Sequence, residues 1–285
     1  MDTALVLTAL ASAFCFALAL VLTQFGLRTA QPMTGAAIAV PTTAVLFVLL
    51  SPVTVQWADW HTPSALKFAA AGIFFPVAVT LLTFSANRHI GPNLTGTLGN
   101  LTPLFAVALA VLLLGEIPSG PQLAGIAAIC AGVAMLFMGR SRTPTAPWLL
   151  ALPLAAALVR GVVQPVVKLG LLDWPNPFAA ATVGYVVSAL VMGGVMAARR
   201  GNWQTPPRHG LAWFVAVGVT NGAAVVLLYM ALARGPVTIV APLVASYPLL
   251  TLALNRCLLG QSELSKFALA GILITVAGVG LLLRS

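Results

Sequence analysis

Charged side chains are scarce in this sequence of 285 residues. Asp, Glu, Lys and Arg together make up 7% of it and hydrophobic residues 60%, whereas a soluble domain is roughly 25% charged. Water would not keep such a surface in solution, so the composition predicts a protein that is solvated by lipid. The 14 Lys and Arg are scattered, mostly near the ends of apolar runs. They form no basic stripe, which argues against nucleic-acid binding.

Acidic, histidine and cysteine side chains are also few, and their positions exclude several kinds of chemistry. The five acids all lie near the ends of apolar runs or between them: Asp2, Asp59, Glu116, Asp173 and Glu263. No carboxylate is therefore expected at mid-membrane, where proton-coupled exporters of cationic drugs commonly need one. The three histidines lie far apart, and the three cysteines lie inside apolar runs. Neither set has metal-ligand or disulfide spacing, so we expect no cofactor, no metal and no enzymatic reaction.

Long apolar runs, broken by proline, glycine and charge, predict an all-α polytopic membrane protein with ten spans, since about 20 apolar residues cross a bilayer. The connections are too short to hold a separate soluble domain. The predicted spans, numbered one to ten, are 3–25, 33–51, 64–86, 93–114, 120–138, 147–168, 177–197, 209–232, 237–258 and 266–283.

Two short glycine-containing runs recur at a constant distance. Gly125 and Gly132 in span five return as Gly271 and Gly278 in span ten, an offset of 146 residues (271 − 125 and 278 − 132). Each pair is seven residues apart and lies on one helix face, where small residues let helices pack closely. Five is an odd number of spans, so the second copy must cross the membrane upside down relative to the first. The sequence therefore predicts two inverted repeats, 1–140 and 147–285.

A further pair of matching segments supports a family resemblance. Leu114-Gly115-Glu116 ends span four, and Leu259-Gly260 followed by Glu263 precedes span ten. With its glycine-rich fifth span, the sequence resembles the drug/metabolite transporter superfamily, in particular the ten-span EamA-type exporters. Within that group it looks most like bacterial exporters of aromatic and other apolar amino acids. The resemblance implies alternating access around a central cavity, lined by spans one to four and six to nine, with spans five and ten outside it.

The basic residues predict how the chain is oriented. Nine of them lie in the odd-numbered loops and four in the even-numbered loops and at the termini. The positive-inside rule then places both termini in the periplasm of a bacterial inner membrane. The expected partners are the lipid bilayer and a small-molecule substrate, with no nucleic acid. The protein is expected to be a monomer, or a dimer formed through spans five and ten.

Span six carries the one basic residue that lies deep in a predicted span. Arg160, Gln164 and Lys168 are spaced by four residues and share one helix face. Lys168 can reach the headgroups, but Arg160 lies about 12 Å further in. A guanidinium at that depth usually faces a bundle interior or a wet cavity. There it can pair with a substrate carboxylate, or alternatively with backbone carbonyls.

Spans four and nine are interrupted by proline at matching points, which is typical of helices that form a transporter's substrate site. Their polar residues are expected to hydrogen-bond a zwitterion; hydrogen bonds between helices are the alternative. The full set of predicted substrate-binding residues is Arg160, Gln164, Asn100, Tyr247, Thr97, Ser246, Asn221, Tyr229 and Tyr185, and the predicted hinge or kink positions are Pro103, Pro165, Pro242 and Pro248.

Together these features predict an exporter of small apolar or aromatic amino acids that works by alternating access. Two alternatives stay open: a carrier of anionic metabolites or sugar phosphates, and a non-transporting membrane scaffold or receptor. Phe16 occupies the position in the first repeat that Arg160 occupies in the second. We expect this break in symmetry to decide which substrate is chosen.

Overall fold

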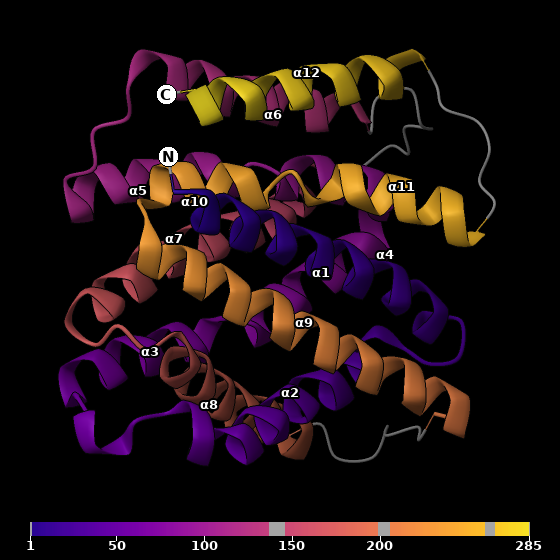
Figure 1. Cartoon of the computed structure of the whole chain (residues 1–285). Coiled ribbons are helices and arrows are strands. Elements are labelled where there is room, and N and C mark those ends of the chain that lie inside the picture. The colour runs from indigo at the N-terminus through magenta and orange to yellow at the C-terminus, as the bar shows by residue number, and fades with distance from the viewer. Residues whose placement is uncertain (1, 137–145, 199–205, 260–265, 285) are drawn as a thin grey trace.

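The computed structural model describes residues 2–136, 146–198, 206–259 and 266–284, which form an all-helical bundle. Most helices cross the molecule in roughly the same direction, and both chain ends lie on one side of it (Figure 1). The helices of the first half are α1 (Thr3–Leu27), α2 (Pro32–Thr54), the short η1 (Trp57–Asp59), α3 (Thr62–Phe74), α4 (Val77–Gly99), α5 (Thr102–Leu114) and α6 (Gly120–Leu136). Those of the second half are η2 (Pro147–Leu150), α7 (Ala151–Asp173), α8 (Pro177–Ala198), α9 (Arg208–Arg234), α10 (Val237–Val244), α11 (Tyr247–Leu259) and α12 (Lys266–Arg284).

Eight segments in the described part of the chain are long and apolar enough to cross a membrane, and two shorter apolar helices, Thr102–Leu114 and Gly120–Met135, accompany them. These ten segments confirm the fold class. The apolar segment Thr62–Thr83 agrees with predicted span three, but the predicted continuity of that span and the predicted connection between spans three and four were wrong. The chain breaks inside span three, at Phe75 and Pro76, and α4 then continues through the predicted connection to Gly99. Proline blocks the preceding helical turn, and Phe75 is accordingly extended. The polar residues between the two predicted spans do not interrupt the helix.

The two halves interleave. α1 packs against α9 and α11, α2 against α8 and α9, α3 against α7 and α8, and both α4 and α5 against α7. Each of these five first-half helices thus makes its main contacts with the second half. A shared centre results, in which a cavity is bounded by both copies of the repeat.

Buried hydroxyl groups join the halves across this centre. Ser12 on α1 donates a hydrogen bond to the carbonyl of Ala224 at 2.7 Å, and Thr43 on α2 donates to the carbonyl of Gly218 at 2.6 Å. Both acceptors belong to α9. In lipid, hydrogen bonds between helices stabilise the bundle by about 1 kcal/mol each.

The repeated glycines pack α6 against α12 on the outside of the bundle. A methyl group added at Gly125 would lie 2.9 Å from the carbonyl oxygen of Gly278, and one at Gly132 would lie 2.7 Å from that of Gly271. Backbones can approach this closely only where side chains are absent. The glycine faces are therefore buried against each other within one chain.

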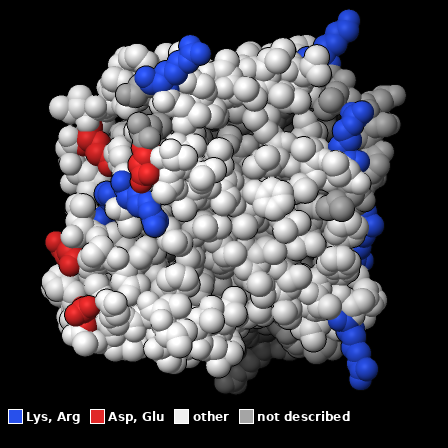
Figure 2. Space-filling view, viewed as in Figure 1, with Lys and Arg blue, Asp and Glu red and all other residues white. Residues whose placement is uncertain are grey.

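The two ends of the bundle differ in charge. We call the side that carries the chain ends, together with Asp2 and Asp173, the terminal face. The opposite side, with Arg28 at the end of α1 and Arg208 at the start of α9, is the basic face. In Figure 2 the acidic side chains in view lie along the left edge, which is the terminal face, and the right edge carries basic side chains.

Candidate functional site

A cavity of about 230 Å³ lies at the centre of the bundle. Its lining comes from α1, α2, α4, α5, α7, α8, α9, α10 and α11, and from the breaks between α3 and α4, between α4 and α5 and between α10 and α11. No described residue of α6 or α12 is part of it. This matches the arrangement that the family resemblance implied. The lining uses the second half of α1, such as Thr23, and the first half of α2, such as Gly35. The cavity therefore extends from the centre toward the basic face.

Both predicted helix breaks open onto the cavity. The first separates α4 from α5 at Asn100, and the second separates α10 from α11 at Ala245. Pro103 and Pro248 are each the second residue of the helix that follows, where no backbone N–H is needed. Pro242 and Pro165 lie inside α10 and α7, and α7 remains helical beyond Pro165. Because proline lacks an N–H, Pro165 cannot bond the carbonyl four residues earlier, at Gly161.

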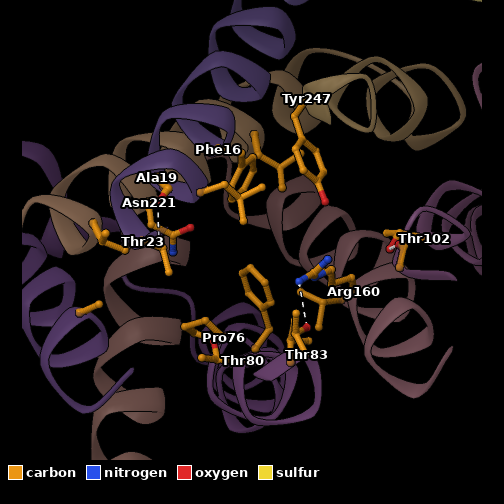
Figure 3. A pocket seen from close by; sticks show the side chains of 18 of the residues that line it. Phe16, Ala19, Thr23, Pro76, Thr80, Thr83, Thr102, Arg160, Asn221 and Tyr247 are labelled. Atoms are coloured by element: carbon orange, nitrogen blue, oxygen red, sulfur yellow. Dashed lines mark hydrogen bonds between the residues drawn. The ribbon is translucent and has the colours of Figure 1, made fainter. Parts of the chain in front are cut away.

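Arg160 reaches into the cavity from α7. Its guanidinium donates a hydrogen bond of 3.3 Å to the hydroxyl of Thr83 on α4 (Figure 3). Gly99, at the end of α4, leaves open space beside the same group. No carboxylate within the described part of the chain is close enough to form an ion pair with Arg160. A half-buried cation is therefore held by one neutral hydroxyl and faces an opening that an anion can fill.

Two buried amides beside Arg160 have unused hydrogen-bonding groups. Asn100 is 4% exposed and Gln164 is 8% exposed. Within the described part of the chain, neither polar atom of the Asn100 side chain has a partner, and the Gln164 carbonyl oxygen also lacks one. An unpaired buried polar group costs about 1–3 kcal/mol. Both side chains line the cavity, so water or a bound molecule in the cavity can satisfy them.

The other predicted residues fall into three groups. Tyr247 points its hydroxyl across the cavity toward Arg160 (Figure 3). Asn221 and Tyr185 also line the cavity but bond each other, with a distance of 2.7 Å from the amide nitrogen to the hydroxyl, and Tyr229 lies buried nearby. Ser246 is outside the lining, and its hydroxyl donates at 2.6 Å to the carbonyl of Leu243. The side chain of Thr97 lies outside the described residues.

Comparison with known proteins bears directly on these features. The sequence model of the EamA-like transporter family matches residues 3–138 and again residues 147–284. The chain belongs to the EamA-like transporter family. It is therefore a multi-pass membrane transporter of the drug/metabolite type. A crystal structure described only as "Crystal structure of protein" has the same fold, with a TM-score of 0.80, 18% sequence identity and coverage of 99% of this chain and 96% of that one. No curated protein matches the chain.

Sequence reasoning missed the threonine and aromatic lining of this EamA-like transporter. Thr80 and Thr83 lie one turn apart on α4 and both face the cavity. Their spacing of three residues is a detectable signal, but the span was read as an unbroken apolar helix. Phe75 and Phe214 form apolar walls. No motif marks them, because phenylalanines of the same kind also face lipid elsewhere in the chain.

Replacement of Asn100 by leucine should affect stability and transport in opposite directions. Leucine has a similar shape but no unpaired polar atoms, so we expect the folded protein to gain about 1–3 kcal/mol. The same change removes two hydrogen-bonding atoms from the wall of the cavity, and transport should fall. Thermal unfolding in detergent and flux in proteoliposomes measure the two effects. A leucine variant that is less stable yet transports normally would contradict this role for Asn100.

Proposed function

We propose that this EamA-like transporter exports small, largely apolar amino acids by alternating access. The observation that carries the proposal is Arg160, a cation in the central cavity with no carboxylate from the described residues beside it. Cations inside a membrane protein usually line a substrate pathway. The guanidinium also presents two parallel donors that suit a carboxylate. Arg160 would thus hold the carboxylate of the substrate.

The unpaired amides favour an amino acid over a simple carboxylic acid. Once Arg160 holds the carboxylate, the adjacent ammonium needs hydrogen-bond acceptors. The hydroxyl of Tyr247 can supply them, and so can the side-chain oxygens of Asn100 and Gln164, which have no partner among the described residues. None of these groups is charged, so a lone cation would find no counter-ion here. This set of groups suits a zwitterion.

The remaining walls suit an apolar side chain of limited size. Phe16, Phe75, Phe214 and Leu20 contribute apolar surface to the cavity. Its volume of about 230 Å³ is below the roughly 300–1,000 Å³ typical of sites for drug-sized ligands. We therefore assign the site to single amino acids with aliphatic or aromatic side chains, and not to large drugs.

The charge on the basic face supports export as the proposed direction of transport. Positively charged loops remain in the cytoplasm, and the cavity extends toward the face that carries Arg28 and Arg208. The conformation is thus ready to take up substrate from the cytoplasm. This supports export across a bacterial inner membrane, with both termini in the periplasm.

A carrier of anionic metabolites or sugar phosphates is the second candidate, and Arg160 is the feature in its favour. A phosphate ester carries nearly two charges and favours at least two converging basic groups. Among the described residues that line the cavity, Arg160 is the one lysine or arginine. The carboxylate of an amino acid therefore matches the site better.

Flux measurements in proteoliposomes test this choice. The purified transporter should move labelled leucine, phenylalanine and related neutral amino acids down a gradient, faster than empty liposomes do. It should not move a sugar phosphate of similar size. Transport of the phosphate ester without transport of any amino acid would overturn the proposal in favour of the second candidate.

A further inference from the structure

The terminal face is closed in this conformation. Leu5 near the start of α1, Trp174 after α7, Leu232 on α9 and Val237 on α10 are all buried close to that end of the bundle. The side chain of Leu5 packs against Gly235, in the connection between α9 and α10. Any pathway from the cavity to the terminal face must therefore open this region.

One carboxylate holds the α9–α10 connection in place. Glu116, which follows α5 in the first half, accepts hydrogen bonds from the backbone N–H groups of Val237 and Thr238, each at 2.8 Å. These are the first two residues of α10 in the second half. A helix start presents unpaired N–H groups and a partial positive charge, both of which favour a carboxylate. Glu116 thus joins the two repeats through both of its oxygens.

A lysine holds the other side of the same connection. The ammonium group of Lys168 on α7 donates hydrogen bonds to the carbonyls of Leu232, at 2.6 Å, and Gly235, at 3.0 Å. These carbonyls end α9, where a cation is favoured. The charge of Glu116 also acts favourably on Lys168. The end of α9 and the start of α10 are therefore held by opposite charges from two other helices.

A second ionic contact joins the halves at this face, but it is weaker. Lys67 on α3 and Asp173 at the end of α7 form an ion pair at 2.7 Å, and their side chains are 35% and 49% exposed. Water screens an exposed pair, so it contributes little. The bonds of Glu116 are half-buried and involve a full charge, which makes each of them stronger.

We propose that Glu116 is a latch that keeps the terminal face closed. Its bonds to α10 exist while the cavity extends toward the basic face, and they break when the terminal face opens. The latch rests on the alternating-access part of the proposed function and is independent of which substrate is carried. Sequence analysis singled out Leu114-Gly115-Glu116 only as a family resemblance; the structure assigns the glutamate a conformational role.

Cysteine labelling can report the opening of the terminal face. Cys15, Cys130 and Cys257 would first be replaced by serine or alanine. Leu5→Cys then places a thiol against the α9–α10 connection that Glu116 holds. A water-soluble maleimide reacts with this thiol only when the terminal face opens. Val133→Cys on α6 is fully buried away from the cavity and reports global unfolding. Protein in nanodiscs exposes both faces to the reagent, so the orientation of the chain does not affect the result.

Two variants weaken the latch from opposite sides. Glu116→Gln leaves one acceptor oxygen and removes the charge. Val237→Pro removes one of the two N–H donors, at the first residue of α10, where proline is well tolerated. The preceding residue, Pro236, already has an extended conformation that suits a following proline. Because the two changes act on the same bonds, the double variant should raise the labelling of Leu5→Cys little more than Glu116→Gln alone does.

We expect each single variant to raise the labelling rate of Leu5→Cys about tenfold, because hydrogen bonds to a charged group are the strong ones. Labelling of Val133→Cys should stay unchanged. Asp173→Asn, the matched control at the exposed ion pair, should change Leu5→Cys labelling less than about twofold.

Unchanged Leu5→Cys labelling in both Glu116→Gln and Val237→Pro overturns the latch. So does a rise in Leu5→Cys that is matched by Val133→Cys, since that is unfolding. The substrate proposal fails separately: if no amino acid is transported but the two variants open the terminal face, the latch stands and the substrate assignment falls.

Discussion

Replacement of Arg160 by alanine is expected to lower the transport of apolar amino acids by about 10- to 100-fold. Hydrogen bonds to a charged partner contribute about 1.5–3 kcal/mol, and each 1.4 kcal/mol is a factor of ten in rate or affinity. The side chain loses only its bond to Thr83 on α4 and has no acidic partner in the described part of the chain. Removal of a charge from the membrane interior should leave stability unchanged or raise it. Initial rates in proteoliposomes measure the effect on transport.

Two further variants separate the role of the guanidinium from that of charge in general. Arg160→Lys keeps the charge but loses the planar fork, so its rate should lie between those of the wild type and the alanine variant. Arg234→Ala is the matched control. Arg234 is exposed at the end of α9, and within the described part of the chain its side chain bonds only the carbonyl of Met230 in the same helix. Its loss should not change transport. Equal rates for wild type and Arg160→Ala would remove Arg160 from the site.

Replacement of Gly132 by alanine is expected to destabilise the protein by about 1–3 kcal/mol, the usual result of overfilling a tight interface. The added methyl would overlap the hydroxyl of Thr275 and the backbone carbonyl of Gly271 on α12. Backbone atoms cannot turn aside, so α6 and α12 would have to separate. The melting temperature in detergent should fall by about 2–10 °C.

Gly193→Ala provides the control for this variant. Gly193 lies on α8, and nothing is found within 4 Å of the methyl that alanine would add. Alanine is favoured over glycine in a helix by about 1 kcal/mol, so this variant should be equally stable or more stable. A Gly132→Ala protein that melts at the wild-type temperature would contradict the packing role assigned to the repeated glycines.

The sequence was sufficient to predict most of the helices and their repetition. Length and apolarity decide which segments span a membrane, and glycines at a fixed offset mark related helices. The breaks in spans four and nine followed from proline in the same way. The break at Phe75 was missed because Pro76 stands in an otherwise uniform apolar run, with no polar residue beside it. The continuation of α4 up to Gly99 was missed because the polar residues before Gly99 were interpreted as a loop between two spans.

The site was predicted less completely than the fold. Arg160, Gln164 and Asn100 stood out because polar groups are costly in a membrane, and the structure places all three at one cavity. Ser246 also stood out, but its hydroxyl is used by the backbone of its own chain. Sequence alone could not separate these cases, since both are polar residues beside a helix break. No sequence pattern identifies the aromatic residues of the cavity wall, because lipid-facing and cavity-facing phenylalanines look the same in a sequence.

The decisive measurement is competition by three matched compounds for labelled phenylalanine uptake into proteoliposomes. Phenylalanine carries both charged groups, phenethylamine lacks the carboxylate, and 3-phenylpropionate lacks the ammonium group. Because Arg160 is assigned to the carboxylate and the unpaired amides to the ammonium group, phenylalanine should compete best, 3-phenylpropionate weakly and phenethylamine least. In Arg160→Ala the advantage of 3-phenylpropionate over phenethylamine should disappear. Competition by phenethylamine as strong as that by phenylalanine, in the wild-type protein, would contradict the assignment of this cavity to amino acids.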